Sequence, residues 1–282
     1  MSRNDLPTFL IIGASKCGTT SLGAYLDAHP QIGMAKPKEL NYFSFHWNQA
    51  LDGYKARFAS LGKDIRGEAS TSYTRAPLIS GVPERIAKVI PDARLIYLMR
   101  NPIERMRSEY IDQLHGGRER APTLEKAIWE NPRYLSVSRY GYQIELYLNY
   151  FARDQLMLVT AEALKSDRVR TIQRILSFLG ADPHVLPPNL DVQLNQAATK
   201  SRIPPLLDPL RTAWSWARPL TGRIPRSWRM RVRSRLGRDV PASSTHLSSQ
   251  QKDRVWQMLA TDQERLQAIV GADQPLWGPE PR

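Results

Sequence analysis

A loop near the start of the chain carries a lysine among small and hydroxyl-bearing residues, a combination that could bind a phosphate group. Residues 13–21 read GASKCGTTS and follow the apolar run Phe9–Ile12. Glycines let the backbone turn sharply and approach an anion closely, and the first amides of a helix point toward negative charge. The lysine adds a full positive charge, and the hydroxyl groups add hydrogen-bond donors. The candidate ligand-binding residues of this loop are Lys16, Cys17, Gly18, Thr19, Thr20 and Ser21.

The order of residues separates this loop from the Walker A loop of ATP- and GTP-binding enzymes, which reads GxxxxGKS/T. Lys16 precedes the second glycine by two residues, and Thr19 occupies the position of the Walker lysine. A lysine inside the loop lies near the bridging oxygen of a terminal group, without the usual arrangement for binding magnesium. A kinase that uses ATP and magnesium also requires an acidic metal ligand after an apolar strand, where this chain has Met99 and Arg100. Such a kinase therefore remains only as an alternative.

A second candidate for phosphate binding follows the apolar run Leu95–Met99. Arg100 comes directly after this run, at the carboxyl end of an expected central strand, where open α/β sheets bind ligands. Asn101 and Pro102 are typical of the start of a helix. A guanidinium suits phosphate because it donates two hydrogen bonds and stays charged. Two phosphate motifs about eighty residues apart indicate a nucleotide with phosphates at two places, for which an ordinary ATP enzyme has no use.

These two stretches resemble motifs of the sulfotransferases that use 3′-phosphoadenosine 5′-phosphosulfate (PAPS). Residues 15–22, SKCGTTSL, match the family's 5′-phosphosulfate loop, roughly PKxGTTxL, except that serine replaces proline at position 15. Residues 99–110, MRNPIERMRSEY, are similar to the family's 3′-phosphate motif, LRNPxxRxxSxY. In that motif an arginine and a serine hold the ribose 3′-phosphate. The resemblance implies this role for Arg100 and Ser108.

A third stretch, in which Lys38 and Glu39 precede an apolar and aromatic run, bears on the acceptor. It resembles the KExxFF stretch of the glycan-type members, including the heparan sulfate enzymes, where the glutamate is taken to be the general base. A hydroxyl or amine is a poor nucleophile until its proton can leave, and a positioned carboxylate can take it. The resemblance implies this role for Glu39, and a surface Lys–Glu pair is the alternative. His46 is the reserve candidate because other branches use histidine, and His115 is a further candidate to line the cleft.

Weaker matches extend the resemblance along most of the chain. Residues 67–73, GEASTSY, resemble a family segment, xExSxxY, that lines the active cleft, although an ordinary junction of strand and turn is equally consistent. Tyr140 opens a helix whose first residues lie near the nucleotide in the family. Lys200 and Arg202 fall where relatives have a basic loop over the adenine and the 3′-phosphate, but the sequence of this loop departs from the family's usual KGR motif.

Composition limits the class of protein. The 282 residues are 41% hydrophobic, and no window of 18 apolar residues predicts a membrane span. The N-terminal residues 1–15 do not read as a signal peptide, because their apolar run is short and leads directly into the loop. The one cysteine, Cys17, excludes an internal disulfide and a cysteine-cluster metal site, which fits a cytoplasmic location. It is either a reactive thiol or a small filler.

Charge is concentrated late in the chain. The net charge is +13, and residues 205–238 hold nine arginines and three tryptophans with Asp208 as the only acidic residue. We interpret this segment as a basic, helical insertion. It could lie peripherally on an anionic membrane, hold an acidic acceptor, or form a solvated helix face. Such a composition also suits single-stranded nucleic acid, but no recognised binding fold supports that partner.

These observations predict one α/β domain over residues 1–282, with a P-loop-NTPase-like, three-layer fold. A central, mainly parallel sheet would be flanked by helices, with strands at 9–12, 95–99 and 156–160 and helices at 168–179 and 249–270. The resemblance implies transfer of a sulfuryl group from PAPS to a hydroxyl or amine of a carbohydrate, lipid or small metabolite, without a metal. The other alternative is a non-catalytic protein that binds polyanions or membranes through residues 205–238. The sequence leaves the oligomeric state open.

Overall fold

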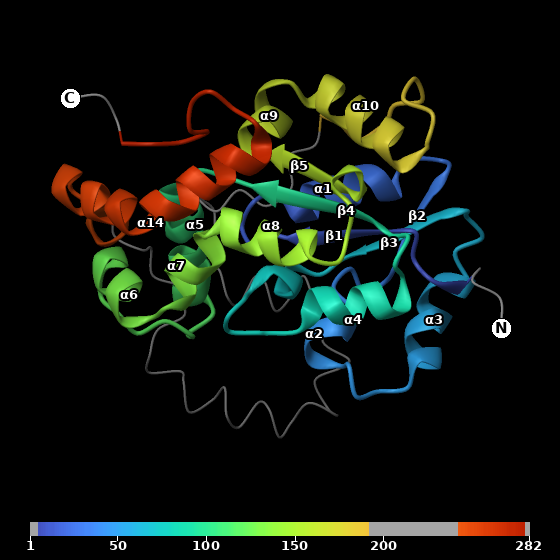
Figure 1. Cartoon of the computed structure of the whole chain (residues 1–282), viewed down its shortest axis with the longest axis horizontal. Coiled ribbons are helices and arrows are strands. Elements are labelled where there is room, and N and C mark those ends of the chain that lie inside the picture. The colour runs from blue at the N-terminus through green and yellow to red at the C-terminus, as the bar shows by residue number, and fades with distance from the viewer. Residues whose placement is uncertain (1–4, 192–241, 280–282) are drawn as a thin grey trace, which may run out of the picture.

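A parallel sheet forms the centre of the protein. The structure, a computed structural model, describes residues 5–191 and 242–279. The strand order is β2-β3-β1-β4-β5, and every pairing is parallel (Figure 1). The strands are β1 (Phe9–Gly13), β2 (Ile32–Met34), β3 (Ile65–Ala69), β4 (Arg94–Met99) and β5 (Leu156–Thr160).

Helices cover both faces of the sheet, which explains why its central strands are apolar throughout. Those on one side are α1 (Thr19–Asp27), α9 (Ala161–Ser166) and α10 (Arg168–Leu179), and those on the other include α4 (Val82–Val89) and α8 (Tyr140–Leu148) (Figure 1). In α10 the buried residues recur at helical spacing, at Ile172, Ile175, Leu176 and Leu179. The predicted α/β fold with a central parallel sheet between helical layers is therefore confirmed.

The remaining elements connect the sheet to the outer parts of the molecule. They are α2 (Tyr42–Phe45), α3 (Leu51–Ala59), η2 (Thr71–Thr74), α5 (Pro102–His115), α6 (Leu124–Glu130), α7 (Arg133–Ser138), η3 (Arg153–Gln155), η6 (Ala242–Thr245) and α14 (Ser249–Val270). A second apolar core lies between α5, α6 and α14 and includes Met106, Tyr110, Leu124 and Leu259. Helix α14 also packs against α8, which joins the C-terminal helix to the helical layer beside the sheet (Figure 1).

The connections from β1 and β4 meet at the carboxyl edge of the sheet. From β1 the chain crosses to β2 at one edge, and from β3 it crosses back over β1 to β4, so β1 lies where the winding direction changes. Ligands of open α/β sheets bind at such a point. Gly18 immediately precedes α1 with φ 98°, a left-handed conformation that glycine adopts without steric cost. As predicted, Asn101 caps α5: its Oδ1 accepts hydrogen bonds from the amides of Ile103 and Glu104 at 3.1 and 3.3 Å.

Part of the sequence-based prediction falls outside these ranges. Lys200, Arg202 and the Arg/Trp-rich segment 205–238 lie beyond the described residues, so their proposed roles stay predictions. Within residues 5–191 and 242–279, no helix has both the length and the apolar character needed to cross a membrane.

Candidate active site

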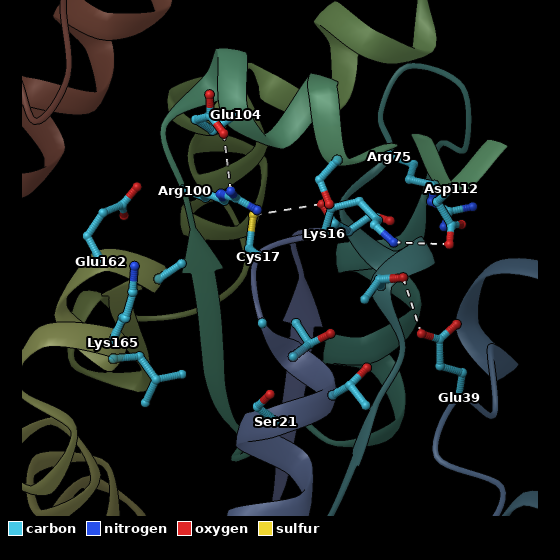
Figure 2. Close-up of a pocket in the computed structure, with 18 of the residues that line it drawn as sticks. Lys16, Cys17, Ser21, Glu39, Arg75, Arg100, Glu104, Asp112, Glu162 and Lys165 are labelled. Carbon is cyan, nitrogen blue, oxygen red and sulfur yellow. Dashed lines mark hydrogen bonds and ion pairs between the residues drawn. The ribbon is translucent and has the colours of Figure 1, made fainter. Parts of the chain in front are cut away.

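A cavity of about 1110 Å³ opens at the carboxyl edge of the sheet. Its walls come from the loops after β1, β2, β3 and β4, from α5 and from the starts of α7, α9 and α10, so segments far apart in sequence meet around one space (Figure 2). Nine residues predicted from the sequence line it, namely Lys16, Cys17, Gly18, Thr19, Thr20, Ser21, Glu39, Arg100 and Ser108. The two candidate phosphate motifs therefore face the same cavity.

The lysine of the first loop points into this cavity. Lys16 has a left-handed backbone conformation, with φ 71°, and its Nζ lies 3.2 Å from Oδ1 of Asp112 (Figure 2). Asp112 belongs to α5 and also forms an ion pair with Arg118, at 3.3 Å. The Asp112 carboxylate thus pairs with the lysine side chain that we expect to bind a phosphate group. An incoming anion would compete with Asp112 for it.

A second lysine, for which the sequence suggested no ligand-binding role, also contacts this loop. Lys38 Nζ donates hydrogen bonds to Thr20 Oγ1 at 3.0 Å and to Thr19 Oγ1 at 3.3 Å. It also lies 3.7 Å from Oε1 of Glu39. Burial lowers the pKa of Lys38, and the neighbouring Glu39 carboxylate opposes this shift. Lys38 therefore joins the phosphate-type loop to the candidate base.

The second motif is fixed by a buried tyrosine. Tyr140 donates a hydrogen bond from its hydroxyl to the carbonyl oxygen of Arg100 at 2.7 Å, and that hydroxyl accepts one from the Arg100 amide at 3.4 Å. Tyr140 is fully buried and does not line the cavity, so it positions the turn after β4. The Arg100 guanidinium itself lies 3.4 Å from Oε2 of Glu104, in the first turn of α5 (Figure 2).

The single cysteine is buried at the base of the loop. Its Sγ lies 3.8 Å from the Tyr140 hydroxyl, and burial raises the pKa of Cys17 to about 12. The thiol is therefore neutral near pH 7. Since the thiolate is the reactive form, this environment fits the small-filler interpretation better than the reactive one.

Glu39 lies across the cavity from Arg100. Its Oε1 accepts a hydrogen bond from Thr71 Oγ1 at 3.4 Å, and its side chain is 40% exposed (Figure 2). The loop that carries Glu39 is anchored from below by Glu68, whose Oε2 accepts the amide hydrogen of Leu40 at 3.1 Å. A partly exposed carboxylate on an anchored loop can reach a substrate without large motion of the backbone.

Glu68 is the centre of a buried hydrogen-bond network. It also accepts hydrogen bonds from the hydroxyls of Tyr54 at 2.9 Å and of Ser70 and Tyr73, both at 2.6 Å. Burial raises the pKa of Glu68, and the four donors oppose this rise. Of the segment 67–73, Thr71 lines the cavity, whereas Glu68 and Tyr73 lie beneath it.

Both histidine candidates lie away from the cavity walls. His46 is exposed, and its Nδ1 is 3.2 Å from Nε2 of Gln49. His115 is buried at the last turn of α5. The structure therefore brings Glu39, and neither histidine, to the cavity.

The cavity walls carry more positive than negative charge, with seven lysines and arginines against four acidic residues. The cations that the sequence analysis did not single out are Arg75, Arg118, Arg133, Lys165 and Arg168. They come from separate segments, so no local motif marks them. In the part of the chain that the structure describes, no three histidine, cysteine or acidic side chains gather to hold a metal ion. A cavity of this charge suits a ligand with several negative charges.

Comparison with known proteins adds independent evidence. A family model described as a sulfotransferase domain matches residues 6–201. The bifunctional heparan sulfate N-deacetylase/N-sulfotransferase 4 of Mus musculus is 28% identical over 203 residues, which are 64% of this chain and 23% of that protein. A membrane-associated sulfotransferase of Dictyostelium discoideum is 34% identical over 125 residues, which are 43% of this chain and 26% of that protein. The matched regions thus span about a quarter of these relatives' length.

Among solved structures, a sulfotransferase from Alicyclobacillus acidocaldarius superposes with a TM-score of 0.69. The two chains are 22% identical, and the superposition covers 97% of this chain and 98% of the other. At this identity the likeness concerns the fold. The family model, however, covers well over half of the sequence and includes both phosphate-type motifs and Glu39, so the chain belongs to the sulfotransferase-domain family.

Proposed function

We propose that the protein transfers a sulfuryl group from PAPS to a hydroxyl or amine of an acceptor. The observation that carries this proposal is the placement of Lys16 and Arg100 on the walls of one cavity, after the neighbouring strands β1 and β4. A nucleotide with a 5′-phosphosulfate and a 3′-phosphate would occupy both motifs at once. An enzyme that uses ATP would have no ligand group for the second of these motifs.

The first motif would hold the 5′ end of the nucleotide. Amides at the start of α1 and the hydroxyls of Thr19 and Thr20 would donate hydrogen bonds to the 5′-phosphate. Arg100 and Ser108 would bind the 3′-phosphate from the turn after β4 and from α5. Lys16 would exchange its contact with Asp112 for the bridging oxygen of the phosphosulfate and stabilise the charge that develops there.

Glu39 would act as the general base. As the acceptor oxygen or nitrogen bonds to sulfur, the bond from sulfur to the bridging phosphate oxygen breaks, and the acceptor proton passes to the Glu39 carboxylate. The product is adenosine 3′,5′-bisphosphate. The contacts to Lys38 and Thr71 orient this carboxylate at the cavity wall.

The acceptor is a carbohydrate, a lipid or a small metabolite. The names of several relatives favour a carbohydrate, since heparan sulfate is a glycan. Those relatives match over a limited part of their length, so the acceptor needs a direct test.

Nucleotide binding tests the proposal and its alternatives. We expect adenosine 3′,5′-bisphosphate to bind with a micromolar dissociation constant in the absence of magnesium, measured by isothermal titration calorimetry, and ATP to bind much more weakly. A preference for ATP with magnesium would indicate a kinase. Absence of nucleotide binding would favour a non-catalytic protein. With bisphosphate binding established, turnover of labelled PAPS against a panel of glycans, lipids and small metabolites would identify the acceptor.

A further inference from the structure

The cavity has a second half that the two phosphate motifs do not occupy. In the sheet, β4 flanks β1 on one side and β3 flanks it on the other. Arg100 follows β4, whereas Arg75 follows β3 through η2, and Glu39 follows β2 at the edge beyond β3. Figure 2 shows Arg100 and Arg75 on opposite sides of Lys16. The half with Arg75 and Glu39 therefore lies away from the expected 3′-phosphate, on the side of the proposed base.

Arg75 is a partly buried arginine of the cavity wall that forms no direct ion pair with a carboxylate of the described residues. It lines the cavity, and its Nε is buried without a hydrogen-bond partner among the residues that the structure describes. The two cations of the phosphate motifs do have carboxylate partners, since Lys16 pairs with Asp112 and Arg100 with Glu104. Burial lowers the pKa of Arg75 to about 10, and the neighbouring Arg133 adds to this effect. The guanidinium still carries its charge at neutral pH.

Arg75 is partly buried, and the pull of the Glu109 and Glu39 carboxylates on its charge is smaller than the effect of burial, so part of its desolvation cost is left uncompensated. Such a cost is understandable where the missing partner arrives with a ligand. Arg133, a second cation of the same wall, is already paired with the buried Glu109 and adds positive potential, and no carboxylate among the described residues forms a direct ion pair with Arg75. A guanidinium fork matches a carboxylate, sulfate or phosphate group through two parallel hydrogen bonds.

We propose that Arg75 binds an anionic group of the acceptor, so that the enzyme prefers acceptors with a carboxylate, sulfate or phosphate near the attacking hydroxyl or amine. This inference rests on the proposed function, because it takes the acceptor to enter beside Glu39. The expected 3′-phosphate site at Arg100 lies on the other side of Lys16, so the nucleotide would not need Arg75.

Binding of matched sugars to the protein loaded with adenosine 3′,5′-bisphosphate tests the inference. The probes are 4-nitrophenyl β-D-glucoside and its counterparts with a carboxylate, sulfate or phosphate at carbon 6, which differ from it only at that position. We expect at least one anionic probe to bind about tenfold or more tightly than the glucoside, as a charge-assisted pair provides. Comparison of the three anionic probes shows whether the site prefers a carboxylate, a sulfate or a phosphate.

Substitutions assign the preference to one residue. Arg75→Gln should remove the preference and Arg75→Lys should keep part of it, while both variants retain the bisphosphate affinity of the wild type, which also reports correct folding. Arg57→Gln changes an exposed arginine of α3 and should keep the full preference. Equal binding of all probes, no binding of any anionic probe, or a preference that survives Arg75→Gln would each overturn the inference. Failure of the wild type to bind the bisphosphate would instead refute the proposed function.

A contact between Arg75 and the transferred sulfuryl group gives a different kinetic result. In that case Arg75→Gln would lower kcat equally for anionic and neutral acceptors and leave their ratio of KM values unchanged. Our inference expects the opposite, with KM rising for the anionic acceptor alone. The split between kcat and KM therefore distinguishes acceptor binding from catalysis at this residue.

Discussion

At the scale of single residues, the cavity holds its reactive groups in contacts that a substrate can replace. Lys16 is paired with Asp112, and Glu39 is paired with Lys38 and Thr71, all at distances between 3.2 and 3.7 Å. Partly exposed ion pairs of this kind contribute little to stability. Their value is in orientation, because each side chain already points at the space where the reaction is proposed to occur.

Replacement of Lys16 tests its part in the transfer step. We expect Lys16→Ala to lower kcat by at least about 100-fold, since loss of a single group aimed at developing charge has an effect of that size. The measurement is turnover of labelled PAPS at saturating acceptor. Lys88→Ala, on the exposed face of α4, is the matched control and should leave kcat unchanged. A variant at Lys16 that keeps more than half of the wild-type rate would refute this role.

Replacement of Glu39 separates catalysis from nucleotide binding. Glu39→Gln keeps the shape of the side chain but cannot take a proton, so we expect kcat to fall by about 100-fold or more. The dissociation constant of adenosine 3′,5′-bisphosphate, measured by calorimetry, should remain within about twofold, because the nucleotide is expected on the other side of Lys16. A near-full rate would remove Glu39 as the base. His46 and His115 would then need testing, although both lie away from the cavity walls.

At the scale of elements, buried charged groups connect the helices that form the cavity. Glu109 of α5 is fully buried between Arg105 of the same helix and Arg133 of α7, and it accepts a hydrogen bond from each. Burial raises the pKa of Glu109, but the two arginines outweigh burial and hold it below its usual range. Arg105 also donates hydrogen bonds to Ser138 Oγ at 2.6 Å and to the Tyr134 carbonyl at 2.7 Å. This cluster fixes α7 against α5.

The lowered pKa gives a prediction for acid stability. A depressed carboxyl pKa contributes stability that is fully present above the unfolded-state pKa, about 4.3, and is lost as the pH falls through the lower pKa of the folded state. Glu109→Gln leaves two guanidinium groups without their anion, so we expect a loss of about 3–5 kcal/mol in unfolding free energy at pH 7. Below about pH 4 the difference between wild type and variant should shrink. Urea unfolding at pH 7 and at about pH 3 measures both effects.

A surface carboxylate provides the control for this experiment. Glu130 of α6 forms an ion pair with Lys126 at 3.6 Å, and both side chains are more than half exposed. Glu130→Gln should change the unfolding free energy by less than about 1 kcal/mol. An equal loss in the two variants, or a loss at Glu109 that does not depend on pH, would contradict the assignment of a buried, ionised carboxylate.

At the scale of the whole molecule, the features that the sequence could predict are the local ones. The loop at residues 13–21 and the turn at Arg100 are contiguous, so their residue order was enough to predict a strand, a loop and a helix start. Other features depend on how β1, β3 and α5 are placed relative to one another. They are the hydrogen bond from Lys38 to Thr20, the ion pair of Lys16 with Asp112 and the environment of Arg75. No spacing in the sequence encodes such contacts, because their partners lie far apart along the chain.

The C-terminal helix supports the cavity through one such long-range contact. Asp262 of α14 accepts hydrogen bonds from the amides of Gly141 and Tyr142, at 3.1 and 2.8 Å, and so caps the first turn of α8. A Cβ at Gly141 would lie 2.7 Å from the Asp262 carbonyl oxygen, which explains the absence of a side chain there. The first residue of α8 is Tyr140, whose hydroxyl holds the backbone of Arg100. A carboxylate outside the cavity is therefore connected to the expected 3′-phosphate site.

This connection predicts a remote effect on nucleotide affinity. Asp262→Ala removes the acceptor for two amides, and we expect a loss of about 1–2 kcal/mol in unfolding free energy, as for other helix caps. Because α8 would hold Tyr140 less firmly, the dissociation constant of adenosine 3′,5′-bisphosphate should rise several-fold, while that of a ligand lacking the 3′-phosphate, adenosine 5′-phosphosulfate, should change less. Glu264→Ala alters an exposed position of the same helix and should affect neither quantity. Equal weakening of both ligands by Asp262→Ala would show that the helix supports the cavity as a whole and would contradict a specific path through Tyr140 to Arg100.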